Sequence, residues 1–92
     1  MPELIPTHGL EIGYDYKDIS IGASWVADQI YAPTGSYVTG GGFICWDLMD
    51  QPAPFDVSCN APAPDSGWQV AGYPTTSGKL RIWICYILNP AV

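Results

Sequence analysis

Few side chains in this 92-residue sequence could take part in catalysis. Nucleophilic or acid–base chemistry needs a nucleophile, a base and a group that orients the base. The single histidine, His8, lies in a short segment that also contains Pro2 and Pro6. A solvated or hydrogen-bonded imidazole is the ordinary interpretation of such a residue. We therefore expect no Ser–His–Asp or Cys–His site, and the sequence predicts a protein that is not an enzyme.

The aspartates offer two alternatives to that interpretation. Asp47 and Asp50 could act as a pair of carboxylates, as in glycosidases. Together with Asp56 they could also gather a hard cation such as calcium. Their spacing matches no defined metal-binding loop, and neighbouring aspartates in small β domains are mostly solvated loop ends. We therefore expect neither a catalytic pair nor a metal, and no cofactor.

The three cysteines, Cys45, Cys59 and Cys85, form no CxxC pair, so a zinc site is not expected. Their odd number leaves at least one thiol free or paired between chains. Two interpretations remain open. Two of the cysteines pair in an oxidising medium, or all three are small buried apolar side chains.

Aromatic residues make up 13% of the chain and are its most informative set. Exposed tyrosine and tryptophan side chains anchor protein interfaces and stack on sugar rings. Regular strand positions predict that Trp68 and Trp83 are core residues. Five residues are candidates for an interface. Tyr14, Tyr16 and Tyr31 lie near polar, turn-like sequence, and Leu4 and Ile5 lie in the N-terminal segment.

Charge and length exclude several classes of function. Only 13% of residues are charged, and the formal net charge is −6. Three basic residues cannot neutralise a phosphate backbone, so we expect neither nucleic-acid binding nor attachment to an anionic membrane. No stretch approaches the roughly 20 apolar residues of a membrane span. A small, charge-poor domain is more readily explained as a component of an assembly than as a free monomer.

The chain is organised around residues 37–48, in which Gly40, Gly41 and Gly42 separate two runs typical of strands. Three glycines there predict a bulge, a sharp bend or a tight crossing of backbones. A phosphate-binding loop is not expected, because no Lys-Ser/Thr and no helix start follow.

The remaining elements are read from alternation and from turn residues. Residues 1–9 predict an extended N-terminal arm, and residues 10–92 predict a single β-sandwich domain. Residues 14–18 and the proline-rich segments 50–54 and 60–67 are predicted to be connections. Residues 80–88 are apolar on both faces and predict a central strand covered on both sides. The other predicted strands are 10–12, 19–31, 55–59 and 68–73, with a two-turn helix at residues 23–30 as the alternative within the second of them. The expected fold is all-β, a small antiparallel sandwich, Ig-like or jelly-roll-like, of about six to eight strands.

The segment Ala32-Pro33-Thr34-Gly35-Ser36-Tyr37-Val38-Thr39-Gly40-Gly41-Gly42 resembles a Cys-Pro-x-Gly-x-x-Val-x-Gly-Gly-Gly motif. That motif belongs to small β domains of secreted actinobacterial proteins and of tail or other virion proteins of their phages. In the family a Gly-Trp-x-Val segment and a terminal strand ending in cysteine follow. Gly67-Trp68-Gln69-Val70 and Ile82-Trp83-Ile84-Cys85-Tyr86 occupy those places here. Ala32 stands where the family has cysteine, so the usual partner of Cys85 is missing. The resemblance implies a sandwich-like module displayed on a surface, without catalytic residues.

Two functions are consistent with these observations. The first is a bacteriophage virion structural protein, a capsid decoration (cement) protein or a small tail-associated protein. It would contact major capsid or tail proteins and copies of itself, with a trimer as one possible oligomer. Such a chain is made in the host cytoplasm, in keeping with the lack of a visible targeting segment. The alternative is a carbohydrate-binding or adhesion module, secreted or at a bacterial surface, that recognises a cell-surface glycan.

Overall fold

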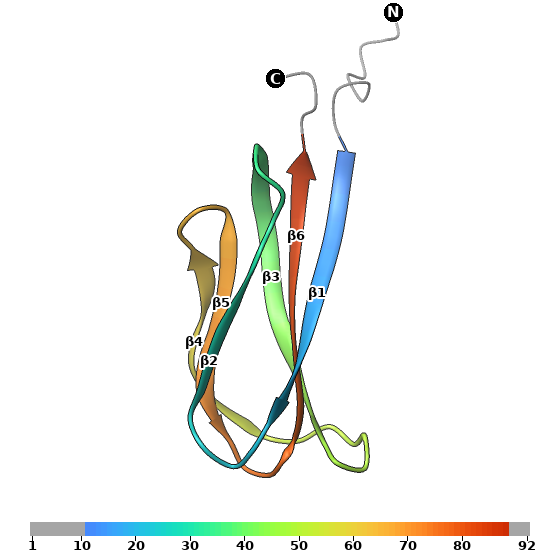
Figure 1. Ribbon diagram of the computed structural model, residues 1–92, viewed down its shortest axis with the longest axis vertical. Helices are drawn as coiled ribbons and strands as arrows, with labels where there is room; N and C mark the ends of the chain where they lie inside the picture. The colour runs from blue at the N-terminus through green and yellow to red at the C-terminus, as the bar shows by residue number, and fades with distance from the viewer. Residues whose placement is uncertain (1–10, 89–92) are drawn as a thin grey trace, which may run out of the picture.

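Six antiparallel strands form two three-stranded sheets that pack face to face (Figure 1). This computed structural model describes residues 11–88. One sheet has the strand order β1-β6-β3 and the other the order β2-β5-β4. The predicted all-β sandwich is confirmed, at the lower end of the expected strand number. The strands are β1 (Glu11–Ile21), β2 (Val26–Tyr31), β3 (Ser36–Asp47), β4 (Phe55–Ala63), β5 (Gly67–Pro74) and β6 (Gly78–Leu88).

The chain changes sheet at every connection except one. Within residues 11–88, only β4 and β5 are joined as a hairpin within a single sheet. Asp65 and Ser66 in its turn have φ values of 63° and 62°. The register pairs Ala63 with Gly67, so three residues form the loop, and the left-handed backbone at two of them reverses the chain. All other connections pass from one layer to the other, which holds the two sheets together covalently.

The core lies between the sheets and is centred on β6. Leu80, Ile82 and Ile84 of β6 and Val70 of β5 are fully buried. Burial of each such side chain stabilises the fold by about 1.5–3 kcal/mol. The predicted central position of β6 is confirmed, because β1 and β3 pair with its two edges. Its outward side is covered by no described element, so the expected cover on both sides is not found.

The glycine-rich stretch does not separate two strands, as the sequence suggested, but lies inside the single strand β3. The expected irregularity is present as a register shift between Val38 and Gly40. The glycines serve a second purpose. A Cβ on Gly41 would stand 2.3 Å from the Trp68 ring, so this indole packs directly on the β3 backbone. Trp68 thereby joins the packing between the sheets, and its Nε1 donates a 2.8 Å hydrogen bond to Asn60 Oδ1.

Two predicted boundaries near the N-terminus are wrong. Residues 19–31 do not form one strand, because the chain turns at residues 22–25 and crosses to the other sheet as β2. Residues 14–18 are not a connection but the middle of β1, paired throughout with β6. Polar residues are tolerated there because β1 is an edge strand whose outward face is exposed. The expected arm at residues 1–9 lies outside the described residues.

A third correction concerns the second proline-rich segment. Residues 60–63 continue β4 instead of forming a loop. Pro62 lacks a backbone N–H, but β4 lies at the edge of its sheet, where one missing donor leaves no partner unpaired. The predicted strand at residues 68–73 is confirmed as β5.

Candidate interaction surface

The outward side of the β1-β6-β3 sheet gathers aromatic side chains from all three strands. Because Leu80, Ile82 and Ile84 point into the core, Arg81 and Trp83 point outward. The strand register then places outward residues of β1 and β3 beside them. We call this surface the aromatic face, and it consists of Ile12, Tyr14, Tyr16, Tyr37, Ile44, Trp46, Arg81, Trp83 and Ile87.

Several residues of the aromatic face are largely exposed to solvent. Ile12 is 87% exposed, Tyr37 69% and Tyr14 58%. Single exposed apolar residues are common on soluble proteins, but a contiguous group on one sheet face marks an interaction site. The aromatic face is therefore the leading candidate for a contact surface.

Trp83 lies at the centre of the aromatic face. A Cβ on Gly42 would stand 2.7 Å from its ring, so the indole rests against the bare backbone of β3. The ring centroids of Trp83 and Tyr14 are 6.3 Å apart, and those of Tyr14 and Tyr16 are 6.2 Å apart. The sequence predicted Trp83 to be a core residue, and this prediction is wrong. No described element covers this side of β6, so the indole lies outside the core between the sheets.

Arg81 is held between two aromatic rings on this face. Its guanidinium carbon lies 3.8 Å from the Tyr16 ring centroid and 5.3 Å from that of Trp46. Its Nε and Nη2 donate hydrogen bonds of 2.7 Å and 3.0 Å to the two carboxylate oxygens of Asp18. Lys79 lies over the Trp46 ring, with its Nζ 4.8 Å from the ring centroid. A stacked and bidentate guanidinium is fixed in position before any partner arrives.

The ion pair shifts the protonation equilibria of both partners. The hydrogen bonds from Arg81 hold the pKa of Asp18 below its ordinary value, against a smaller opposing effect of burial. The same hydrogen bonds raise the pKa of Arg81. Both groups are therefore charged across the neutral range.

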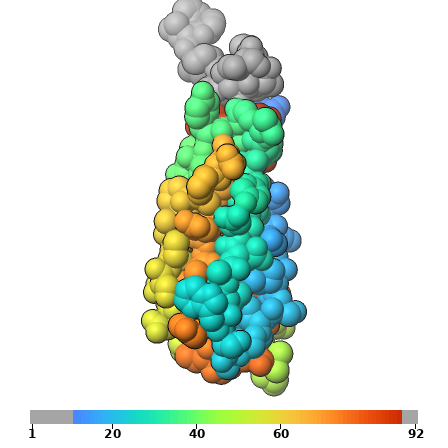
Figure 2. All heavy atoms as spheres, turned by 60° about the vertical axis from the view of Figure 1, so that its left-hand side comes forward, coloured from blue at the N-terminus to red at the C-terminus, as the bar shows by residue number. Residues whose placement is uncertain are grey.

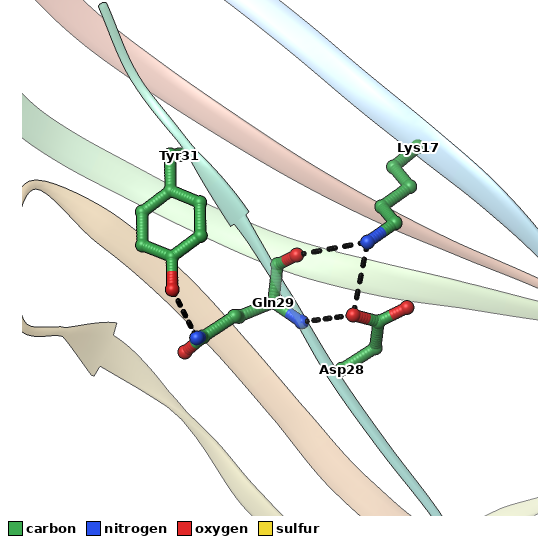
Figure 3. Close-up of polar contacts among 4 residues, drawn as sticks. All are labelled: Lys17, Asp28, Gln29 and Tyr31. Atoms are coloured by element: carbon green, nitrogen blue, oxygen red, sulfur yellow. Dashed lines mark hydrogen bonds and ion pairs between the residues drawn. The ribbon is translucent and has the colours of Figure 1, made fainter.

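A second ion pair joins the two sheets along the side where β1 and β2 lie. Lys17 Nζ stands 2.9 Å from Asp28 Oδ1 and donates a second hydrogen bond of 3.3 Å to the Gln29 carbonyl (Figure 3). Asp28 Oδ1 also accepts the Gln29 N–H at 2.8 Å. The Gln29 side chain points the other way, toward the Tyr31 hydroxyl.

The structure places the residues that the sequence singled out for an interface on different surfaces. Tyr14 and Tyr16 lie together on the aromatic face, whereas Tyr31 lies on the outward side of the other sheet and is 50% exposed. Leu4 and Ile5 lie outside the described residues, as does His8. The sequence analysis did not identify the other members of the face as interface residues: Ile12, Tyr37, Ile44, Trp46, Arg81, Trp83 and Ile87. The alternation of Arg81 and Trp83 in residues 80–88 was the one signal that could have found part of it.

The cysteines lie in three separate parts of the sandwich. Cys45 is buried between the sheets, Cys59 faces outward on β4, and Cys85 faces outward on β6. All three are free, and a disulfide needs Cβ atoms only about 4 Å apart. Pairing within one chain would therefore require a rearrangement of the fold. Burial raises the pKa of the Cys45 thiol.

Asp47, Asp50 and Asp56, the aspartates considered for a catalytic or metal site, lie at the end of β3, in the β3–β4 turn and on β4. Asp47 Oδ1 accepts the backbone N–H groups of Met49 and Gln51 and so closes the turn between β3 and β4. Asp50 lies in the same turn with φ 59°, whereas Asp56 lies on β4 opposite Tyr73. Within residues 11–88, no three acidic, histidine or cysteine side chains converge on a common point. This part of the chain also contains no helix long and apolar enough to cross a membrane.

Comparison of the chain with protein-family models, with curated proteins and with solved structures found no match. The functional conclusions therefore rest on the geometry of residues 11–88 and on the sequence resemblance described above.

Proposed function

We propose that this protein is a structural component of a bacteriophage virion, a capsid decoration protein or a small tail-associated protein. It acts by protein–protein contacts and has no catalytic role. The observation that carries the proposal is the exposed aromatic face of the β1-β6-β3 sheet. The resemblance of residues 32–86 to virion modules of actinobacterial phages supplies the setting.

The aromatic face has the composition of an interface centre. Tyrosine, tryptophan and arginine are enriched where binding energy is concentrated, and this face contains all three within one sheet. Its aromatic rings and its guanidinium are already ordered by mutual contacts, which reduces the entropy lost on association. The partner that we assign to the face is a second copy of the chain, within a homo-oligomer that attaches to capsid or tail proteins.

Charge supports contact with a further partner through a different surface. Six carboxylates lie in the described chain beyond the two that pair with Lys17 and Arg81, and the formal net charge is −6. An acidic oligomer would be steered toward basic patches on a capsid or tail protein. The sequence-based alternative, a carbohydrate-binding module, is favoured by a separate observation on the other sheet that is described in the next subsection.

Reconstitution on virus particles tests the proposed function. The purified protein is added to particles of its phage from which the gene has been deleted. We expect saturable binding and greater resistance of the particles to heat. The double variant Tyr14→Lys/Tyr37→Lys should not bind, whereas Val57→Lys, 46% exposed on the other sheet, should bind like the wild type. Failure of the wild-type protein to bind such particles contradicts the proposal.

A further inference from the structure

The outward side of the β2-β5-β4 sheet contains a shallow trough of about 320 Å³. Figure 2 looks onto this side, where β5 in orange lies between β4 in yellow and β2 in blue-green. Small side chains of all three strands line it: Ala27 of β2, Ala71 of β5 and Cys59 of β4. The trough exists because the outward positions at the middle of the sheet carry little side-chain volume.

Aromatic side chains stand at both ends of the trough. Trp25 and Tyr73 meet edge to face at one end, with centroids 5.2 Å apart, and are 50% and 52% exposed. At the other end the Tyr31 ring lies over Gly67, where a Cβ would stand 3.1 Å from it. Gly67 and Tyr73 are about 20 Å apart along β5 at the rise of an extended strand. The rings are therefore spaced for an elongated ligand.

The middle of the trough carries amide groups between its small side chains. Gln29 and Gln69 face each other across β2 and β5, and both line the hollow. Gln29 Nε2 donates a hydrogen bond to the Tyr31 hydroxyl, which orients its amide. Among the hydrogen bonds of residues 11–88, none involves the Gln69 side chain. Gln69 offers two N–H donors and a carbonyl acceptor to a ligand lying along the trough, and Gln29 offers its carbonyl and the N–H that is not given to Tyr31.

The charge around the trough selects against anions. All three basic residues of the sequence, Lys17, Lys79 and Arg81, lie on the β1-β6-β3 sheet. Of the residues that the structure describes, Asp28 is the one charged residue that lines the trough, and its carboxylate is paired with Lys17. Asp56 points outward on the same sheet. The one cation close to these residues, Lys17, is already paired with Asp28, so an anionic ligand would meet no unpaired cation and a neutral ligand fits best.

We propose that this trough binds a neutral polysaccharide. Sugar rings expose C–H faces that pack on Trp25 and Tyr31, and they expose hydroxyls that exchange hydrogen bonds with Gln29 and Gln69. A protein partner fits less well, because small alanines and amides form the floor, whereas interface centres are enriched in aromatic residues, methionine and arginine. This site is independent of the assembly role of the aromatic face, since the two surfaces lie on opposite sides of the sandwich.

Titration of the full-length protein with four hexasaccharides tests the proposal: chitohexaose, cellohexaose, maltohexaose and the anionic hexagalacturonate. Binding is followed through the side-chain amide signals of Gln29 and Gln69 and the indole N–H of Trp25 in ¹⁵N-correlated NMR spectra. We expect at least one neutral sugar to shift these signals. We also expect it to slow alkylation of Cys59 by iodoacetamide and to leave the alkylation rate of Cys85, on the opposite face, unchanged.

Variants assign the binding to the trough. Trp25→Ala should weaken binding about tenfold, the value of one good aromatic contact. Ala71→Tyr should abolish binding by filling the trough from an outward position that does not enter the core. Leu48→Ala, which truncates a side chain 77% exposed in the β3–β4 turn, should leave it unchanged. All three variants are first compared with the wild type by urea unfolding.

Three results would overturn the inference. The first is that none of the neutral sugars shifts the trough signals at millimolar concentration. The second is that binding survives Ala71→Tyr in a folded variant, which would place the sugar elsewhere. The third is that hexagalacturonate binds as well as the neutral sugars, which would contradict the charge argument. In every one of these cases assembly through the aromatic face can still be measured separately.

Discussion

The guanidinium of Arg81 lies 3.8 Å from the centroid of the Tyr16 ring while it forms a bidentate pair with Asp18. Tyr16 and Asp18 are alternate residues of β1, so one edge strand supplies both the ring and the carboxylate. The arginine of the central strand is thereby held against the rings of Tyr16 and Trp46, within a largely aromatic and aliphatic surface. This arrangement lets a charged residue take part in an aromatic interface without a search through rotamers.

Arg81→Lys tests that arrangement. Lysine keeps the charge but has no planar fork for Asp18 and cannot stack its head group on two rings. We expect weaker association of the chain, by several-fold, and little change in the midpoint of urea unfolding. Association is measured by sedimentation as a function of concentration. Equal association of Arg81→Lys and the wild type would show that the planar group is not needed.

The glycines of β3 differ in what surrounds them, and this difference predicts their tolerance. Gly41→Ala would place a methyl group 2.3 Å from the Trp68 ring, whereas nothing lies within 4 Å of a Cβ on Gly40. We expect Gly41→Ala to lower the free energy of unfolding by about 1–3 kcal/mol, the usual cost of overpacking. Gly40→Ala should change it by less than about 0.5 kcal/mol. Urea unfolding of both variants decides the matter, and equal effects would contradict the packing of Trp68 on β3.

Acid should weaken the contribution of Asp18. Its pKa is lower in the folded chain than its ordinary value near 3.9. The carboxylate therefore stabilises the fold above about pH 4, and this stabilisation is lost as the pH falls through the folded pKa. The free energy of unfolding of the wild type should exceed that of Asp18→Asn at neutral pH, and the gap should close on acidification. A gap independent of pH would exclude this carboxylate as its source.

The cysteines should differ in reactivity. Burial and a raised pKa leave Cys45 with little thiolate, whereas Cys59 and Cys85 are partly exposed. Brief treatment of the folded, monomeric Tyr14→Lys/Tyr37→Lys variant with a maleimide, followed by peptide mass spectrometry, should find label on Cys59 and Cys85 and not on Cys45. In denaturant all three should react. Early labelling of Cys45 in native conditions would contradict its place between the sheets.

The sequence predicted the sandwich well where local pattern decides structure. Alternation in residues 80–88 predicted the central strand, and turn residues predicted most strand ends. The sequence-based prediction failed where the structure of a segment depends on the strand with which it pairs. Polar residues 14–18 resemble a connection until their pairing with β6 is known, and Pro62 is tolerated only because β4 is an edge strand.

The candidate site was harder to foresee for the same reason. Tyr16, Trp46 and Arg81 come from three strands that are distant in the sequence, and only the register of two strand pairs brings them together. Trp25 likewise lies in the turn between β1 and β2 and contacts Tyr73 of β5, and the alternation of residues 19–31 gave no sign of this turn. Tyr14 and Tyr16 were recognised as candidates for an interface from their polar neighbours, but their partners on β3 and β6 could not be.

The most direct test of assembly through the aromatic face is the mass of the protein in solution by light scattering, with and without reductant. We expect an oligomer for the wild type and for Val57→Lys, and a folded monomer for Tyr14→Lys/Tyr37→Lys. Insensitivity to reductant would assign the contact to the face itself and not to an intermolecular Cys85 disulfide. A monomeric wild type, or an oligomer that survives the double substitution, would contradict the account.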